Sequence, residues 1–390
     1  MILIINAGSS SIKFTLYKKD NSSAIQLTGQ IKQIASPKVE FVFKKENEPE
    51  QKIIPDQVND FASAIQYLIN WLEKNIYFSE IKAIGHRIVH GMMHHEPVII
   101  SESLLAELIQ IIPYAPEHLP NEIKLVEAFK RQYPELIQVA CFDTSFHAHM
   151  PDVAKRLPLP RRYYEMGIQR YGFHGLSYEY LMEELERIAG NKMATGKVIL
   201  AHLGNGASIA AVKNGQCMDT SMGFTPASGL VMSTRTGDID PGIATFLMQS
   251  EKLNLREFDQ LVNHQSGLLG VSGTTGDMEE LLKIEDTDMR SAEAVELFCY
   301  QIKKWIGSYT AVLEGLDTLV FSGGIGENAA VIRSRICSGL QFLGVDIDEK
   351  KNAQHEEIIS SDKSKVRLMV IKTNEELMIA RSVYKILNNA

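Results

Sequence analysis

Apolar residues recur along this chain with two periods, and the change of period marks the predicted elements. The runs "ILIIN" and "IKFTLY" near the N-terminus flank a turn of small residues and predict a β-hairpin. The stretch "DQVNDFASAIQYLINWLEKN" predicts an amphipathic helix, because one face carries Phe61, Ile65, Leu68, Ile69 and Leu72. The stretches "IKAIGHRIVHG" and "LIQVACFD" return to strand patterns. This alternation of strands and helices predicts an α/β fold.

Polar residues mark where several helices should begin and end. Ser101 is placed to cap the helix "ESLLAELIQII", which Pro113 should stop. Asn121 precedes a second amphipathic stretch, "EIKLVEAFKRQY". A long helix is expected from residue 291 to about residue 313. The last helix should start at Asn374, whose side chain would cap it.

Two segments about 200 residues apart share one order of residue types. Both "ILIINAGSSSIKFTLY" and "VILAHLGNGASIAAV" read as apolar strand, polar residue, glycine turn and apolar strand, and they align Gly8 with Gly204. The repeat predicts two domains of similar plan that present their turns to a shared cleft. Unrelated hairpins also produce such patterns, so duplication stays one of two explanations. The "LPLP" loop places the domain boundary close to residue 150.

Composition and charge exclude several classes of protein. The chain has 390 residues and a net charge of −8, which argues against a broad nucleic-acid or membrane surface. Its four cysteines are scattered without a C-x-x-C pair, which indicates reduced thiols. The apolar start lacks a basic region, and no run reaches the length of a membrane span. We therefore expect a cytoplasmic protein.

Three glycine-rich turns are candidates for binding phosphate. "GSSS" and "HLGNGAS" lie inside predicted hairpins, and "SGGIGEN" joins a predicted strand to a helix. Backbone N–H groups at such junctions face an anion readily. Each turn alone has an ordinary structural explanation. Together they favour a polyphosphate ligand.

Charged residues in apolar or cramped surroundings are the other candidates. Strand alternation places Arg87 and Val89 on one face, where they could hold a small carboxylate and its apolar tail. A structural salt bridge explains Arg87 equally well. Asp143 ends a buried strand, and strand ends border the crevice of open α/β sheets. His174 lies among glycines in "RYGFHG", and Arg235 lies in the polar loop "MSTRTGDIDPG".

Ten motifs then occur in one order: "NAGSSSIKF", "GHRIVHG", "FDTSFH", "RYGFHG", "HLGNGAS", "DTSMGFTP", "TRTGDIDPG", "SGLLGVSG", "GGIGEN" and "TNEEL". In this order the chain resembles the acetate kinases of the acetokinase family, over about residues 2–380. The resemblance implies membership of the sugar kinase, Hsp70 and actin superfamily. It implies duplicated ribonuclease-H-like domains with the active site in the cleft between them, and a homodimer. The implied domains are residues 1–148, with the helix 376–390 packed on them, and residues 149–375.

The resemblance also implies a reaction, in which ATP and acetate give ADP and acetyl phosphate by direct in-line transfer with Mg²⁺, or Mn²⁺ in its place. The catalytic positions it implies are Asp143, His174, Arg235 and Arg87. The acetate-binding positions are Arg87, Val89, Phe173 and Pro226. The ATP and ADP contacts are Lys13, His202, Leu203, Gly204, Asn205, Gly206, Asp277, Gly324, Ile325, Gly326, Glu327 and Asn328. The metal positions are Asn6 and Glu375.

Several residues depart from the family pattern, and two of them affect substrate preference. Glu117 stands where the acetate pocket usually has an apolar residue, so the acyl-chain preference is open. Glu279 stands where an Arg usually lies beside the adenosine, so the base preference is open. A propionate or butyrate kinase of the same family is therefore an alternative. An actin-like ATP-binding sensor without kinase activity is an alternative of another class, although it would have no use for Arg87 and Arg235.

Overall fold

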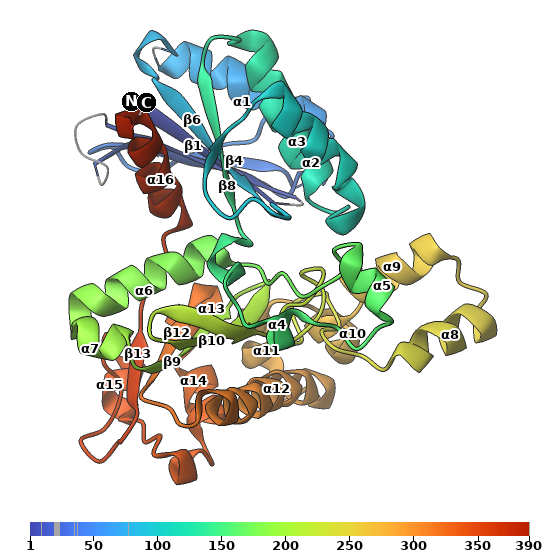
Figure 1. Cartoon of the computed structure of the whole chain (residues 1–390), viewed down its shortest axis with the longest axis vertical. Coiled ribbons are helices and arrows are strands. Elements are labelled where there is room, and N and C mark those ends of the chain that lie inside the picture. Colours follow the sequence, from blue (N-terminus) through green and yellow to red (C-terminus); the bar gives the residue numbers. More distant parts are fainter. Residues whose placement is uncertain (9, 19–23, 35, 37, 77, 390) are drawn as a thin grey trace. The chain divides into compact units, whose positions relative to one another are not determined.

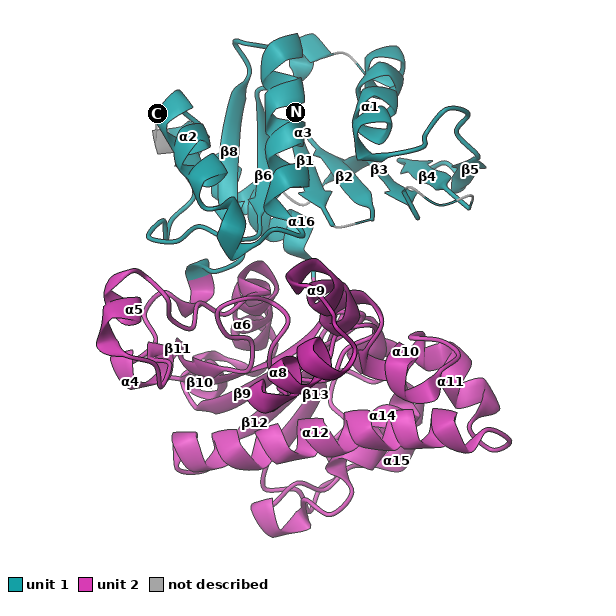
Figure 2. Cartoon of the chain, turned by 90° about the vertical axis from the view of Figure 1, so that its right-hand side faces the viewer, with its two compact units in different colours: residues 1–145, 374–390 teal, residues 146–373 magenta. Residues whose placement is uncertain are grey.

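The computed structural model describes residues 1–8, 10–18, 24–34, 36, 38–76 and 78–389 of the chain (Figure 1). These residues form two compact units. Unit 1 comprises residues 1–145 and 374–390, and unit 2 comprises residues 146–373 (Figure 2). The domain limits after residues 148 and 375 stay predictions beside these observed units.

Unit 1 is built on a mixed sheet with the strand order β5-β4-β3-β2-β1-β6-β8-β7. Its strands are β1 (Ile2–Ala7), β2 (Ile12–Tyr17), β3 (Ile25–Lys32), β4 (Glu40–Lys45), β5 (Gln51–Ile53), β6 (Ala83–Ile88), β7 (Val98–Ile99) and β8 (Ile137–Phe142). Strands β1 to β5 pair antiparallel in sequence order, while β6 joins β1 and β8 in parallel. The predicted hairpin is β1–β2.

Helices lie on both faces of this sheet (Figure 1). They are α1 (Phe61–Asn75), α2 (Glu102–Gln110), α3 (Leu119–Gln132) and α16 (Glu375–Asn389), with the short 3-10 helices η1 (Phe78–Glu80) and η2 (Ile112–Tyr114). Leu3 and Ile5 belong to the apolar core that includes α1 and α3. Gly85 faces α16, and an added Cβ there would lie 2.6 Å from Ile379 Cγ2. The period-two alternation of β1 and β6 thus supplies one apolar face to each helix layer.

Unit 2 contains a five-stranded sheet with the order β11-β10-β9-β12-β13 among the described residues. Its strands are β9 (Lys197–Leu203), β10 (Ala207–Lys213), β11 (Gln216–Thr220), β12 (Thr318–Ser322) and β13 (Arg367–Val370). Strands β11, β10 and β9 pair antiparallel, and β12 and β13 continue the sheet from β9 in parallel. The strands β3-β2-β1-β6-β8 of unit 1 have the same order and the same directions. The hairpins of Gly8 and Gly204 therefore hold the same place in two sheets of one plan. This confirms the predicted α/β fold with duplicated ribonuclease-H-like sheets.

Helices also lie on both sides of the second sheet, with α6 on one side and α12 on the other (Figure 1). The helices of unit 2 are α4 (Asp152–Lys155), α5 (Arg161–Glu165), α6 (Gly175–Ala189), α7 (Asn191–Ala194), α8 (Pro241–Ser250), α9 (Leu255–His264), α10 (Gly267–Ser272), α11 (Met278–Ile284), α12 (Met289–Leu313), α13 (Gly323–Asn328), α14 (Ala330–Cys337) and α15 (Glu349–Ala353). The 3-10 helices are η3 (Ser145–His147) and η4 (Gln341–Leu343). The first residue of η3, Ser145, still belongs to unit 1. No helix in the described part of the chain is both long enough and apolar enough to cross a membrane.

Two predicted helix caps are confirmed by the hydrogen bonds. Ser101 Oγ accepts the Leu104 N–H at 3.1 Å, at the start of α2. Asn374 Oδ1 accepts the Leu377 N–H at 3.0 Å, in the first turn of α16. The predicted helix start at Asn121 is wrong, because α3 begins at Leu119 and Asn121 lies inside its first turn.

Two other local predictions also need correction. Strand β6 ends at Ile88, so Val89 lies outside the ladder; its N–H donates to the Glu122 side chain instead of to a neighbouring strand. The stretch "GGIGEN" was expected to be a turn before a helix, but it is the short helix α13 itself. Glu327 Oε1 accepts the Gly323 N–H at 3.0 Å and so satisfies one of the first donors of this helix.

Candidate active site

The hairpin β1–β2 of unit 1 places Asn6 directly opposite Lys13 in the antiparallel register. Cross-strand partners of this kind present their side chains on the same face of a sheet. Asn6 is nearly buried, with 8% of its surface exposed, whereas Lys13 is exposed. The turn between them includes Ser9, which lies outside the described residues, so the predicted approach of phosphate to this turn stays a prediction.

Asn6 meets the first turn of α16 on that face. Its Nδ2 donates to Glu375 Oε2 at 3.0 Å and to Glu376 Oε1 at 3.2 Å. The two glutamates lie at the positive end of the α16 dipole, which stabilises their charge. The Asn6 amide group and the carboxylates of Glu375 and Glu376 thus meet, although they come from segments far apart in sequence. Glu376 and Lys13 also line one pocket of about 220 Å³ in unit 1.

The side chains of Asn6, Glu375 and Glu376 carry oxygens of the kind that bind a hard divalent cation. Carboxylate and amide oxygens are the ligands that Mg²⁺ prefers, and it usually completes its shell with water and phosphate oxygens. Within the described ranges, no group of three or more His, Cys, Asp or Glu side chains is arranged to hold a metal ion. A cation at Asn6 and Glu375 would therefore complete its shell with oxygens of water or of a bound ligand.

The second polar group in unit 1 is an ion pair at the ends of β6 and β8. Arg87 Nη2 donates a hydrogen bond to Asp143 Oδ2, and Arg87 Nη1 donates to the Ala7 carbonyl oxygen at 3.3 Å. Asp143 is fully buried and the Arg87 side chain is 13% exposed. Burial opposes the charge of Arg87, but the carboxylates of Asp143 and Glu375 more than offset it and raise the pKa of Arg87 above its ordinary value.

The Nε–H group of Arg87 makes no hydrogen bond to the described part of the protein. The Nε atom is buried. A buried donor without a partner costs free energy. Such donors are rare in native proteins, so this one indicates that a bound ligand supplies the acceptor. A carboxylate oxygen is the natural acceptor for this N–H, since guanidinium groups match carboxylates in geometry.

The backbone that follows β6 is held by three polar groups. The Asp143 N–H donates to the Ile88 carbonyl oxygen at 2.9 Å. Glu122 Oε2 accepts the Val89 N–H at 2.9 Å, and Thr144 Oγ1 accepts the Gly91 N–H at 3.3 Å. The roles of Glu122 and Thr144 were not predicted from the sequence. A signal for Glu122 existed, because it lies on the apolar stripe of α3.

In unit 2, His174 takes a left-handed conformation at the N-cap of α6, with φ 59°. Its Nδ1 lies 2.9 Å from Ser208 Oγ on β10, and its ring stacks on His202 with centroids 4.3 Å apart. Ser208 Oγ also bonds to the Tyr178 hydroxyl. Strand β10 and helix α6 therefore fix both the position and the plane of the His174 ring.

The glycine turn after β9 lies against this histidine and against Arg235. A Cβ built on Gly206 would lie 3.3 Å from His174 Nε2 and 3.9 Å from Arg235 Nη1. A Cβ on Gly204 would lie 3.7 Å from the Gly324 backbone nitrogen. The structure thus brings the turn, both predicted stabilising residues and the start of α13 together within unit 2. Because Gly204 and Gly206 have no side chain, the backbone of residues 202–206 lies close to His174, Arg235 and Gly324.

Arg235 itself is fixed by neighbouring backbone. Its Nη1 donates to the Pro226 carbonyl oxygen at 3.1 Å. Gly267 has φ +63°, and a Cβ there would lie 2.7 Å from the Arg235 carbonyl oxygen. Of the residues predicted to line the acyl pocket, Pro226 therefore contacts Arg235, and buried Phe173 precedes His174. The third, Val89, belongs to unit 1 and is buried there.

The second predicted nucleotide loop is held from behind by a buried arginine. Helix α13 contains the predicted contacts Gly324, Ile325, Gly326, Glu327 and Asn328. Arg333, which is fully buried, donates to the Gly326 and Glu327 carbonyl oxygens at 2.8 and 3.0 Å. These bonds satisfy carbonyl groups at the end of α13. This role of Arg333 was not predicted from the sequence.

Asp277 has a structural function in the fold. Its Oδ1 accepts the N–H groups of Glu279 and Glu280 at 2.8 and 3.1 Å and caps α11. Glu279 Oε1 pairs with Lys283 Nζ at 2.6 Å on the exposed side of that helix. Ser233 Oγ donates to the Gly276 carbonyl oxygen at 2.8 Å, which ties this segment to the Arg235 loop. The adenosine contact of Asp277 stays a prediction.

Comparison with known proteins gives consistent matches over the whole chain. Residues 1–381 match the model of the acetokinase family. An acetate kinase of Methylocella silvestris is 40% identical over 398 residues, which cover 99% of this chain and 98% of that protein. An acetate kinase of Rickettsia typhi is 41% identical over 397 residues, with 99% of both chains covered.

Two solved structures are similar in fold and in sequence. The crystal structure of Porphyromonas gingivalis acetate kinase has a TM-score of 0.87 and 36% identity, with 99% of each chain covered. The crystal structure of a propionate kinase from Francisella tularensis subsp. tularensis has a TM-score of 0.90 and 40% identity, with 98% of each chain covered.

Proposed function

Because this chain belongs to the acetokinase family and is a phosphotransferase with a carboxyl group as acceptor, we propose that it is an acetate kinase. It would transfer the γ-phosphoryl group of ATP to acetate, giving acetyl phosphate and ADP, and would also run the reverse reaction. The observation that supports this most is the Nε of Arg87, a buried donor with no partner among the described residues. A small carboxylate supplies the acceptor that this donor lacks.

The proposed chemistry needs no general base. Acetate is already ionised near pH 7, so its oxygen is a ready nucleophile. The protein has to hold this oxygen in line with the γ-phosphoryl group and stabilise the charge that develops. In unit 1, Arg87 would bind the carboxylate, with Val89 beside the methyl group. Asp143 fixes the guanidinium plane through its ion pair with Arg87.

In unit 2, His174 and Arg235 would stabilise the transferring phosphoryl group. Both lie next to Gly206, where the absence of a side chain leaves room for phosphate oxygens. The backbone of residues 202–206 and of α13 would contact the nucleotide phosphates. Donors placed at developing negative charge are the main source of catalysis in such sites, and they act without reorganising during the reaction.

We propose that Asn6 and Glu375, whose side chains are joined by the Asn6 Nδ2 to Glu375 Oε2 hydrogen bond, hold Mg²⁺, or Mn²⁺ in its place, through their side-chain oxygens. When bound, the cation neutralises phosphate charge. Lys13, opposite Asn6 in the hairpin, would add a further positive charge for the nucleotide phosphates. Asp143 holds Arg87 through their ion pair; in this scheme it would organise Mg²⁺ and its waters and would accept no proton.

A propionate or butyrate kinase is the second candidate. The propionate kinase of Francisella tularensis subsp. tularensis is 40% identical to this chain, so the comparisons do not separate the two substrates. Glu117 is half-buried just before α3. The values of kcat/KM for acetate, propionate and butyrate decide between them. Since one methylene is worth only about 1 to 3 kcal/mol of discrimination, all three acids should react to some extent.

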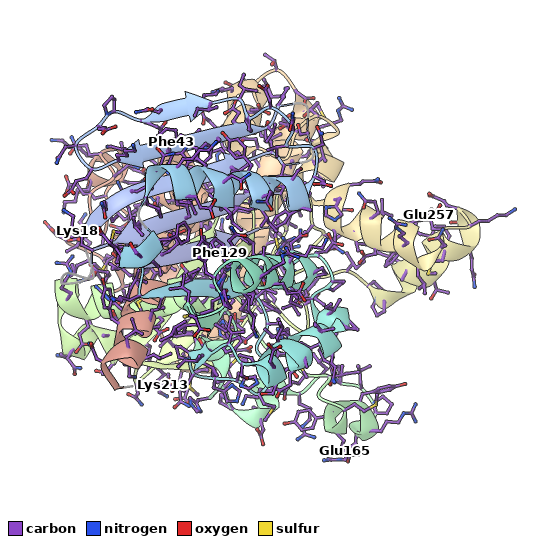
Figure 3. The ribbon with its side chains drawn as sticks, turned by 90° about the horizontal axis from the view of Figure 1, so that it is seen from above. Lys18, Phe43, Phe129, Glu165, Lys213 and Glu257 are labelled. Carbon is purple, nitrogen blue, oxygen red and sulfur yellow. The ribbon has the colours of Figure 1, made fainter. Side chains whose placement is uncertain are left out.

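We also propose a cytoplasmic homodimer that associates through α8 and α9. Neither helix has a buried residue, although α8 carries Ile243 and Phe246, which are 42% and 66% exposed, and Leu255 of α9 is 79% exposed. Both helices lie at one end of unit 2, and α9 with Glu257 stands clear of its body (Figures 1 and 3). A second copy of the chain would cover these side chains. The four cysteines are free and buried, which supports a reducing compartment.

Light scattering on the purified protein tests the dimer. Phe246→Asp should convert it to a monomer, because the substitution would bury a charge in the contact. Val153→Asp, at a residue that is 84% exposed on α4, is the matched control. A monomeric wild-type protein, or a dimer unaffected by Phe246→Asp, would remove α8 from the interface.

A further inference from the structure

Glu122 is a buried carboxyl group beside the proposed carboxylate site that the mechanism above does not use. It lies in the first turns of α3 and has 2% of its surface exposed. Its Oε2 accepts the N–H of Val89, the residue that follows the end of β6. Its Oε1 is buried and has no hydrogen-bond partner among the described residues. The sequence separation between Glu122 and Val89 is 33 residues, so only the tertiary fold joins them.

We propose that Glu122 is a positioning residue for carboxylate binding, acting through the Val89 N–H on the backbone that carries Arg87 and Val89. This inference rests on the proposed function. Val89 has left the β ladder, so without Glu122 its buried N–H would lose its acceptor. The backbone at Val89 would then be free to shift, which would move the apolar Val89 side chain and loosen the strand end that carries Arg87.

The protonation of Glu122 controls the charge of this site. Burial raises the pKa of Glu122 to about 8, against the opposing effect of Arg87 and with support from Asp143. Below that pH the neutral acid leaves Arg87 and Asp143 as a balanced pair. Above it a second carboxylate charge lies beside Arg87 and repels a substrate carboxylate.

The other charged and titratable groups around α3 do not produce the same change. Arg87 on β6 and Asp143 after β8 are the charges that act on Glu122. Burial lowers the pKa of His90 to about 4, so this ring is neutral throughout. His118 precedes the helix. Helices α1 and α2 bring two carboxylates to α3: Glu73 accepts a hydrogen bond from Tyr133, and Glu102 pairs with Lys130. Lys130 and Tyr133 follow Glu122 by more than two helical turns, so these carboxylates lie away from Glu122.

The test measures KM for acetate and kcat between about pH 6.5 and 9.5 in wild-type protein and in Glu122→Gln, Glu122→Ala and Glu127→Gln. If only the neutral form binds well, the wild-type KM should rise about tenfold from one pH unit below the pKa to one above it, with a smaller change in kcat. Glu122→Gln keeps an acceptor for Val89 and carries no charge, so its KM should lose this rise. Glu122→Ala removes the acceptor, so its KM should be raised at every pH.

Glu127→Gln is the matched control, because Glu127 is exposed on the same helix and should keep the wild-type profile. The same rise of KM in Glu122→Gln and in wild-type protein would overturn the proposal. A wild-type KM that is constant over this range would also overturn it. Failure of the proposed function gives a different result, namely no turnover of acetate by wild-type protein at any pH. Thermal unfolding of each variant shows which of them remain folded.

Discussion

The ion pair between Arg87 and Asp143 offers the sharpest test of how unit 1 is held together. Asp143 is fully buried, and its Oδ2 accepts a hydrogen bond from Arg87 Nη2. Arg87→Met keeps most of the length of the side chain but leaves the Asp143 carboxylate buried without its partner. Breaking a buried pair from one side costs about 3 to 5 kcal/mol, because the remaining charge stays desolvated. We expect a loss of this size for Arg87→Met.

The double variant should recover part of that loss. Asp143→Asn alone removes the carboxylate charge, but the guanidinium keeps its bond to the Ala7 carbonyl oxygen at 3.3 Å. With both changes, no unpaired charge is left, so the double variant should lose less stability than the two single variants added together. A coupling energy of about 2 kcal/mol is expected for a contact of this kind.

The chain allows unit 1 to be followed separately, because it has only two tryptophans. Trp71 lies in unit 1 and packs on Phe41 and Phe43, with ring centroids 4.9 and 4.6 Å apart, whereas Trp305 lies on α12 of unit 2. Urea unfolding monitored by Trp71 fluorescence in a Trp305→Phe background reports on unit 1. Single-variant losses that add within about 0.5 kcal/mol would refute the ion-pair account.

Three further predictions concern catalysis and stability. Arg235→Ala should lower kcat by about 10² to 10³ with little change in the KM for acetate, as measured by steady-state kinetics. Gly206→Ala should weaken ATP binding in calorimetry, because its methyl group would lie 3.3 Å from His174 Nε2, whereas Gly307→Ala on α12 meets no atom within 4 Å and is the control. Glu122 should make the protein less stable as pH rises from about 4.5 to about 8, since the folded state keeps a proton that the unfolded state has released. Urea unfolding at pH 6 and 8 should show this decline in wild-type protein and not in Glu122→Gln. Since one pKa unit corresponds to about 1.4 kcal/mol, the decline in the free energy of unfolding is a few kcal/mol at most.

The elements that depend on local patterns were predictable from the sequence. The β1–β2 hairpin follows from two apolar runs around small residues, and its register places Asn6 opposite Lys13. The caps at Ser101 and Asn374 follow from short-range hydrogen bonding, and both were confirmed. The repeat that aligned Gly8 with Gly204 corresponds to a five-strand arrangement that both sheets contain, β3-β2-β1-β6-β8 in unit 1 and β11-β10-β9-β12-β13 in unit 2.

Contacts between distant segments could not be predicted from such patterns. Asn6 and Glu375 are 369 residues apart, and their hydrogen bond depends on α16 returning to the first sheet. The end of β6 at Ile88 depends on Glu122, since that side chain offers the Val89 N–H an acceptor outside the ladder. The resemblance named residues for the site, but the structure adds the partners that orient them.

The central claim is that this chain phosphorylates acetate. Purified protein with ATP, Mg²⁺ and millimolar acetate, in the presence of hydroxylamine, should form acetyl hydroxamate in proportion to the ADP released. Arg87→Met should lose most of this activity while its unit 2 remains folded by Trp305 fluorescence. ADP release without hydroxamate from acetate, propionate or butyrate would contradict the account and favour an ATP-binding protein without carboxylate kinase activity.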